Sequence, residues 1–216
     1  MILTTIWSNP FDNAIEIAFS NFFDILPSKI KEGIAIFSAL GNLGIFLLIA
    51  GILLLLFKQT RKIGFICLLS VFSTLIFNDL IFKNIFDRAR PFQDPNLVNQ
   101  LQSIVNNNGE VYGLKPDSPS FPSGHTFQSF AAFGAILFYY FKDKENKKSY
   151  IPSLVFFGIY AFLMGISRVL LSHHYFTDVL AGAILGGLSG ILVYYVIEYT
   201  PVLYNKLMSK FKKNEN

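Results

Sequence analysis

Long uninterrupted apolar runs constrain this chain more than any other feature of its sequence. Residues 33–57 contain no charged side chain, and four further runs carry ionisable groups only near their ends: 64–82, 124–141, 150–171 and 176–199. A helix of about 20 residues, rising ~1.5 Å per residue, crosses the hydrocarbon core of a bilayer. We therefore expect an all-α fold, a polytopic membrane helix bundle with five transmembrane helices.

The composition agrees with a membrane protein and argues against a nucleic-acid partner. Of the 216 residues, 52% are hydrophobic and 15% are charged, and the mean hydropathy is +0.46. The net charge is +4, but the basic residues do not form one stripe interleaved with exposed aromatic residues, so we expect no nucleic-acid binding. The single cysteine, Cys67, excludes an intrachain disulfide framework and the paired-cysteine metal patterns.

The first 32 residues form a separate N-terminal segment. Within residues 1–32, the stretch NPFDNAIEIAFSNFFDILP alternates acidic residues with Ile and Phe at helical spacing, and its apolar part is too short to cross a bilayer. We expect an amphipathic helix that lies on the membrane surface. The alternative, in which residues 11–26 make a sixth span, stays open. No positively charged stretch precedes the apolar residues, so no cleaved signal peptide is expected.

The basic residues indicate how the bundle is oriented. Most of the 18 Lys and Arg residues fall in the segments 58–62 and 142–148 and in the tail 201–216. The positive-inside rule places these segments in the cytoplasm. The membrane domain, residues 33–200, then has a long external loop at 83–121 and a short external turn at 172–176. We expect a multi-pass protein of the cytoplasmic (inner) membrane with its active site on the periplasmic or extracellular side.

Three polar clusters meet on that external side. The first is KNIFDRARP, the second is PSGH and the third is SRVLLSHHYFTD; together they contain Lys83, Arg90, Ser123, Gly124, His125, Arg168, His174 and Asp178. Charged groups near a membrane are costly, so they are functional candidates. Three cations suit a phosphate, and the helix start at Ser123 and Gly124 offers free backbone N–H groups to an anion. PSGH alone would also suit an ordinary helix cap.

The histidines supply the reactive groups. Asp178 lies four residues after His174, a spacing that lets it fix the ring tautomer and makes His174 an oriented nucleophile. His125 comes from another helix and can act as general acid and then as general base. Since no carboxylate cluster accompanies the motifs, we expect no metal and no cofactor.

The three motifs, in this order and spacing, resemble the signature of the type 2 phosphatidic acid phosphatase family over roughly residues 30–200. The resemblance implies a metal-independent phosphatase that forms a phosphohistidine. It implies that His174 is the nucleophile, Asp178 its orienting partner and His125 the acid and base. It also implies a phosphate cradle made of Lys83, Arg90, Ser123, Gly124 and Arg168. Two departures are Phe176, where many members have proline, and Asp87, where glycine often precedes the first arginine.

The expected activity is hydrolysis of a phosphate monoester or diphosphate on a lipid headgroup, with undecaprenyl diphosphate favoured as the substrate. Lipid A, phosphatidylglycerol phosphate and phosphatidate are the alternatives. A lipid phosphotransferase and a non-catalytic lipid transporter are alternatives of another class. The partners are thus the bilayer and a phosphorylated lipid. The small-residue spacing of Gly182, Gly186 and Gly190 suits packing inside the bundle or at a homodimer interface.

Three neighbouring residues receive lesser roles. Asp79 precedes Lys83 by four residues and is expected to brace it through an ion pair. Arg88 is expected at the rim of the site. His173 is interpreted as a structural or headgroup-facing residue and not as a catalytic one.

Overall fold

The computed structural model describes residues 9–94, 97, 101 and 117–214, and this part of the chain contains helices and no strands. The remainder of the predicted external loop, including residues 102–116, lies outside the described residues. The main helices are α1 (Pro10–Asp24), α2 (Ser28–Ala39), α3 (Ile45–Leu55), α4 (Arg61–Ser73), α6 (Gly124–Lys142), α7 (Ile151–Leu170) and α8 (Phe176–Asn214). The shorter elements are η1 (Asn42–Gly44), the π-helical η2 (Thr74–Phe82), α5 (Lys83–Ile85), η3 (Pro91–Gln93) and η5 (Lys147–Tyr150).

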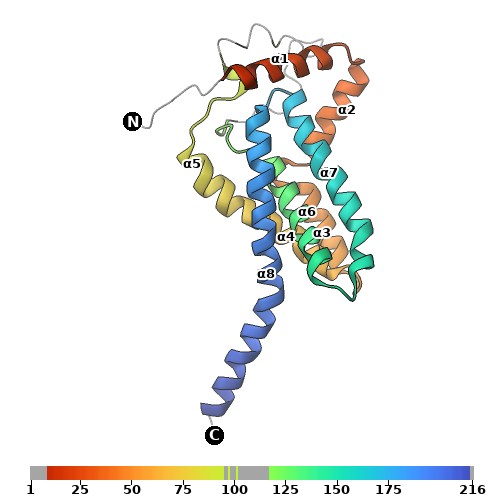
Figure 1. Cartoon of the computed structure of the whole chain (residues 1–216), viewed down its shortest axis with the longest axis vertical. Helices are drawn as coiled ribbons and strands as arrows, with labels where there is room; N and C mark the ends of the chain where they lie inside the picture. The colour runs from red at the N-terminus through yellow and green to blue at the C-terminus, as the bar shows by residue number, and fades with distance from the viewer. Residues whose placement is uncertain (1–8, 95–96, 98–100, 102–116, 215–216) are drawn as a thin grey trace.

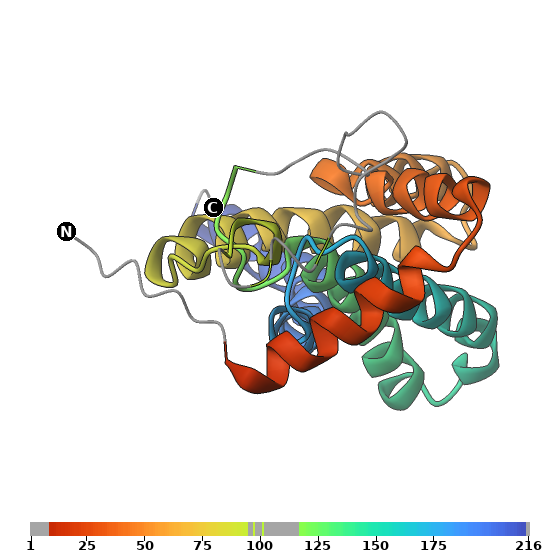
Figure 2. The ribbon, with the colours of Figure 1, turned by 90° about the horizontal axis from the view of Figure 1, so that it is seen from above.

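Helix α6 forms the centre of the bundle. It packs most extensively against α8 and also against α7 and α4, while α3 packs against α4. Helix α1 crosses one end of the bundle, above the turn that joins α7 to α8 (Figures 1 and 2). The α3–α4 and α6–α7 connections lie at the opposite end, where α8 also continues toward the C-terminus (Figure 1).

A row of glycines explains the close approach of α6 and α8. A Cβ atom added to Gly186 would come within 2.2 Å of the carbonyl oxygen of Phe127, and one added to Gly190 within 2.5 Å of that of Ala131. Gly182 also packs against the start of α6. Of the two roles left open for this stripe, the structure therefore shows packing inside the bundle.

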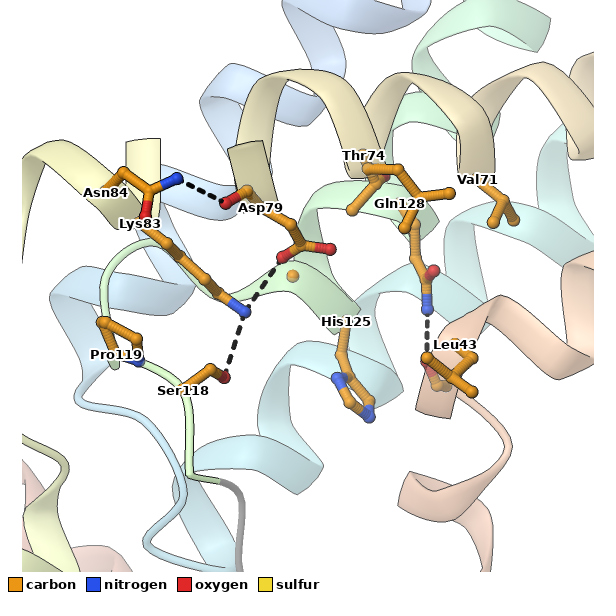
Figure 3. A pocket seen from close by; sticks show the side chains of 13 residues that line it. Leu43, Val71, Thr74, Asp79, Lys83, Asn84, Ser118, Pro119, His125 and Gln128 are labelled. Carbon is orange, nitrogen blue, oxygen red and sulfur yellow. Dashed lines mark hydrogen bonds and ion pairs between the residues drawn. The ribbon is translucent and has the colours of Figure 1, made fainter. Parts of the chain in front are cut away.

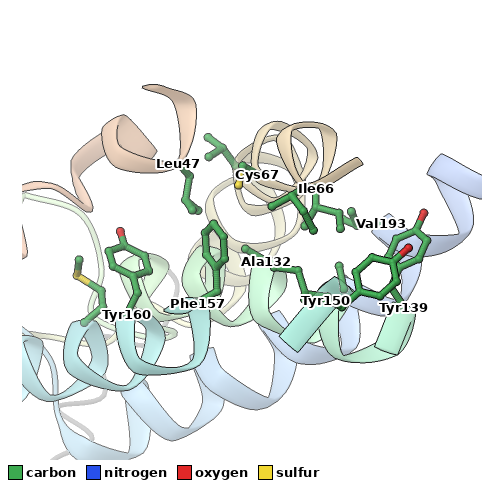
Figure 4. Packing of buried hydrophobic residues seen from close by; sticks show 14 residues of the cluster. Leu47, Ile66, Cys67, Ala132, Tyr139, Tyr150, Phe157, Tyr160 and Val193 are labelled. Atoms are coloured by element: carbon green, nitrogen blue, oxygen red, sulfur yellow. The ribbon is translucent and has the colours of Figure 1, made fainter. Parts of the chain in front are cut away.

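The apolar core fills the middle of the bundle (Figure 4). Side chains from α3, α4, α6, α7 and α8 meet there, and the fully buried Ile66, Cys67 and Ala132 lie at its centre. The rings of Tyr139 and Tyr150 stack near the end where α6 turns toward α7, with centroids 5.6 Å apart. This core fixes α6 relative to its neighbours and so positions the residues at its N-terminus.

The expectation of five continuous spans is not confirmed. Within the described residues, three helices are long and apolar enough to cross a membrane, over Arg61–Ile85, Lys147–Leu170 and Phe176–Lys206. The predicted span 33–57 is instead broken between α2 and α3, which meet at a bend of 59° and would give a fourth span only as a bent pair.

Helix α6 is the other predicted span that does not stand out as apolar. It has 19 residues, and its first turns carry His125, Thr126 and Gln128. A helix surrounded by other helices can keep polar side chains because its neighbours, rather than lipid, cover them.

Helix α1 is amphipathic, but its polar side faces the protein. Asp12, Glu16 and Ser20 are buried against the bundle, whereas Phe11 and Phe22 are more than half exposed. Asp12 turns inward because donors from the distant Arg88 and Thr177 meet its carboxylate there. The exposed side of α1 is apolar, as the prediction of an amphipathic helix requires; its place on the membrane surface stays a prediction.

Candidate active site

A pocket opens where the N-terminus of α6 meets η1, η2 and α5. Its volume is about 440 Å³. Three of the predicted site residues line it, namely Lys83, Gly124 and His125, while Arg90, Arg168 and His174 lie buried outside its lining. Figure 3 shows the Lys83 amine between Asp79 and Ser118, with the His125 ring across the pocket. The remaining wall is mostly apolar, with Leu43, Val71 and Leu75.

Lys83 is held at the pocket by two partners. Its Nζ lies 3.0 Å from a carboxylate oxygen of Asp79 and 3.3 Å from the Ser118 hydroxyl oxygen. The predicted brace from Asp79 is therefore confirmed. The ion pair keeps the ammonium group beside Gly124. An anion bound there would replace the Ser118 hydroxyl as a hydrogen-bond acceptor of Lys83.

Arg90 connects the loop after α5 to the α7–α8 turn. Its guanidinium donates to the carbonyl oxygens of Ser118 at 2.8 Å and His173 at 2.7 Å, and its Nη1 lies 3.1 Å from Nε2 of His174. Burial lowers the pKa of Arg90 to about 10, although the charge of Asp178 opposes the shift. Arg90 therefore stays cationic at neutral pH beside the predicted nucleophile.

Arg168 approaches the same region from the end of α7. It is 3% exposed, and its Nη1 donates to the hydroxyl oxygen of Ser38 at 2.7 Å. Within the described part of the chain its Nε is buried without a hydrogen-bond partner. Burying a donor without an acceptor destabilises the folded protein, and a bound phosphate oxygen would supply the missing acceptor.

His174 lies in the turn between α7 and α8 and is only 2% exposed. Its Nδ1 lies 2.7 Å from the carbonyl oxygen of Ser120, which can only accept, so Nδ1 carries the proton and the unprotonated Nε2 accepts from Nη1 of Arg90 at 3.1 Å. Burial lowers the pKa of His174 well below its usual value, and the charges of Arg90, Arg168 and Lys83 lower it further. A neutral imidazole with an unprotonated Nε2 is the form that a nucleophile requires.

Asp178 does not orient His174 directly, contrary to the sequence-based expectation. Its carboxylate lies 3.7 Å from His174 Nδ1, beyond hydrogen-bond distance. It accepts instead from the Arg88 guanidinium, the Ser120 hydroxyl and the backbone N–H of Tyr175. The spacing of four residues brings Asp178 near the ring, but the Ser120 carbonyl oxygen is closer to Nδ1 and accepts its hydrogen bond.

Arg88 is a functional candidate that the sequence placed at the rim and the structure places inside. It is 6% exposed; one Nη donates to Asp178, and the other donates to Asp12 of α1 at 2.7 Å. Asp12 also accepts from the hydroxyl of Thr177 at 2.6 Å. Burial alone would raise the pKa of Asp12, but the hydrogen bonds from Thr177 and Arg88 outweigh it and the net shift is downward.

The N-terminus of α6 only partly matches the predicted phosphate cradle. Ser123 is the N-cap residue, but its backbone N–H donates to the carbonyl oxygen of Asp178 at 3.1 Å and is occupied. Gly124 is the first residue of the helix and lines the pocket. Backbone N–H groups in the first turn of a helix have no acceptor within the helix, so the N–H of Gly124 can bind an anion. His125 follows, with Nε2 2.9 Å from the side-chain oxygen of Asn42.

His173 has a different environment from His174. It is buried, and its ring packs edge-on against Phe92, with centroids 6.2 Å apart. Its carbonyl oxygen accepts from Arg90. These contacts agree with the structural role expected for His173.

The described ranges contain no group of three or more His, Cys, Asp and Glu side chains arranged to hold a metal ion. Three acidic residues near the site are engaged by a cation or a hydroxyl: Asp79 by Lys83, Asp12 by Arg88 and Thr177, and Asp178 by Arg88 and Ser120.

Fold and site together define the class of protein: an integral membrane helix bundle in which buried cations converge on one histidine at the end of the bundle. Residues 59–201 match the family model of the PAP2 superfamily, so the chain belongs to that superfamily. Over most of its length the fold is also that of a crystal structure described as the first transmembrane PAP2 type phosphatidylglycerolphosphate phosphatase from Bacillus subtilis. That match has a TM-score of 0.60 and 26% identity and covers 90% of each chain.

Curated relatives from a plant and from a bacterium each match more than half of the chain. A probable lipid phosphate phosphatase 4 of Arabidopsis thaliana is 35% identical over 133 residues, which are 57% of this chain and 42% of the relative. A lipid A 4'-phosphatase of Bacteroides thetaiotaomicron is 30% identical over 154 residues, 68% of this chain and 61% of the relative. The chain thus spans about half the length of these two relatives.

Proposed function

We propose that this protein is a lipid phosphatase that transfers a phosphoryl group from a lipid headgroup to His174 and then to water. The observation that carries the proposal is the environment of His174. The Ser120 carbonyl holds its proton on Nδ1, and Nε2 faces Arg90, a group that would bind the phosphate under attack.

The reaction divides into two steps. In the first, Nε2 of His174 attacks the phosphorus atom, the bond from phosphorus to the lipid oxygen breaks, and His125 donates a proton to that oxygen. In the second, His125 takes a proton from water as the water attacks the phosphohistidine, which frees His174 and inorganic phosphate.

Cations would stabilise the transition state in place of a metal. Lys83, Arg90 and Arg168 approach the site from α5, the following loop and α7, and the unpartnered Nε of Arg168 is ready to bind an equatorial oxygen. Removing a single such donor typically lowers kcat by ~10²- to 10³-fold.

The substrate proposal rests on the similar proteins. The Bacillus structure, which this chain matches over 90% of its length, is that of a phosphatidylglycerolphosphate phosphatase, so phosphatidylglycerol phosphate is the leading candidate. Undecaprenyl diphosphate, favoured from the sequence, remains a candidate because the same cations would hold a diphosphate. Lipid A and phosphatidate complete the set.

Purified protein in detergent, offered these four lipids with no added alcohol, tests the proposal. We expect phosphate release that resists EDTA, is greatest for one lipid, and disappears in His174→Ala. Release only when a lipid alcohol is added would indicate a phosphotransferase. No release from any lipid would favour a transporter, and activity lost to EDTA and restored by Mg²⁺ would contradict metal independence.

We also propose that the site faces the periplasm or the cell exterior, from the cytoplasmic membrane. In support, the basic segments 58–62 and 142–148 lie at the end of the bundle opposite the α7–α8 turn that carries His174 (Figure 1). The positive-inside rule assigns the basic end to the cytoplasm.

A further inference from the structure

The break between α2 and α3 has an unusual backbone. Leu43 has a φ of 51° and Gly44 a φ of 69°, so two consecutive residues adopt the left-handed region. For leucine this conformation is costly and persists only where the surroundings impose it. A Cβ atom on Gly44 would also come within 2.6 Å of the Val71 side chain. The break is therefore a defined structure and not a loose connection.

Helix α6 holds this break from the catalytic side. Gln128 donates its side-chain N–H to the carbonyl oxygen of Gly41 at 2.6 Å. One turn earlier on the same helix, His125 Nε2 lies 2.9 Å from Oδ1 of Asn42. A Cβ atom on Gly41 would lie only 2.3 Å from Cδ2 of His125, so the break packs directly against the imidazole ring.

We propose that Asn42 is a positioning residue for His125, and that the α2–α3 break is a fourth element of the active site beside the three sequence motifs. The proposal rests on the proposed function, in which His125 is the general acid and base. Asn42 would act through the His125 ring and would not touch the substrate.

The chemistry of the contact suits both states of the ring. With Oδ1 of Asn42 as acceptor, Nε2 keeps its proton whether His125 is cationic or neutral. Only Nδ1 then exchanges a proton with the leaving oxygen or with water. Figure 3 shows a ring nitrogen of His125 on the side of Ser118 and Lys83, where the phosphate ester would bind. Asn42 would thus fix the tautomer and the plane of the ring, as the Ser120 carbonyl does for His174.

Two substitutions of nearly equal size separate the hydrogen bond from packing. Asn42→Leu removes the acceptor, and Asn42→Asp keeps an oxygen in its place. We expect Asn42→Leu to lower kcat/KM for the lipid substrate about tenfold, the upper range for one hydrogen bond, and Asn42→Asp to retain most of it. Asn146→Leu, the same change in the exposed loop after α6, is the matched control and should have no effect.

The decisive measurement is a double-mutant cycle with His125→Ala, on the lipid and on p-nitrophenyl phosphate. Because nitrophenolate leaves without a proton, kcat/KM for the aryl ester should lose little in Asn42→Leu or in His125→Ala. On the lipid, Asn42→Leu should add nothing in the His125→Ala background, since residues acting through one group are not additive. Additive losses, or equal losses on both esters, would overturn the proposal.

Gly41→Ala provides a second variant if Asn42→Leu does not fold. Its new methyl group would displace the His125 ring and should produce the same selective loss on the lipid ester; a variant with full lipid activity would contradict the proposal. Failure of the proposed function looks different, because wild-type protein would then release no phosphate, or His174→Ala would remain active.

Discussion

At the scale of single residues, His174 and Asp178 have different hydrogen-bond partners. His174 donates a hydrogen bond from Nδ1 to the Ser120 carbonyl oxygen, while Asp178 accepts from Arg88 and Ser120. Asp178 is thus linked to His174 through Ser120, whose hydroxyl donates to Asp178 and whose carbonyl oxygen accepts from His174. The ion pair with Arg88 is buried, so loss of either partner leaves an uncompensated charge.

The first prediction concerns this ion pair. Asp178→Asn should lower kcat by about 10- to 100-fold, less than His174→Ala, which should abolish turnover because the attacking atom is gone. Arg88→Gln should resemble Asp178→Asn in steady-state kinetics, and the double variant should be no worse than either single one. Arg61→Gln, at the other end of the bundle, serves as the control. A fully active Arg88→Gln protein would show that the pair has no part in catalysis.

At the scale of elements, α1 is joined to the site through buried acidic residues. Asp12 reaches Arg88 and Thr177, and Glu16, one turn later, is fully buried. Burial raises the pKa of Glu16 to about 8, and the charges of Asp178 and Asp12 add to the shift. Helix α1 is therefore docked with a neutral carboxylic acid in its interface at pH 7.

Glu16 predicts a pH dependence of stability. The unfolded chain loses this proton above pH 4.5, but the folded protein keeps it to about pH 8, so stability is lost as pH rises between these values. Glu16→Gln should remove that loss and stabilise the protein at pH 7 by on the order of 3 kcal/mol, with little effect near pH 4.5. Thermal unfolding in detergent across pH 4.5–8 measures this difference in stability. Glu145→Gln, a change at an exposed position, is the control. An unchanged pH profile in Glu16→Gln would contradict a buried neutral acid.

The sequence predicted those elements that depend on local pattern. The apolar runs located α4, α7 and α8, and the motif spacings identified the residues that gather around His174. The pattern could not predict the break at residues 40–44, because the run 33–57 is apolar on both sides of it. The inward face of α1 and the Ser120–His174 bond were also missed, because each depends on a partner far away in the sequence.

At the scale of the whole molecule, the polar chemistry and the basic segments occupy opposite ends of the bundle (Figure 1). This polarity predicts the outcome of cysteine labelling in a Cys67→Ser background. Asp117→Cys, beside the site, should react with an impermeant thiol reagent in cells with a permeabilised outer barrier, and Asn146→Cys should not. Both positions are exposed. The reverse pattern would place catalysis in the cytoplasm.

The central claim is that His174 carries the phosphoryl group. Rapid mixing of the protein with substrate, followed by an alkaline quench and peptide mass spectrometry, tests it directly, since phosphohistidine survives alkali. An aryl phosphate given to His125→Ala should make the intermediate accumulate, because the leaving group needs no acid while water has lost its base. We predict one phosphate on His174. Turnover of the same substrate with no phosphate on His174, or with the phosphate on another residue, would contradict the account.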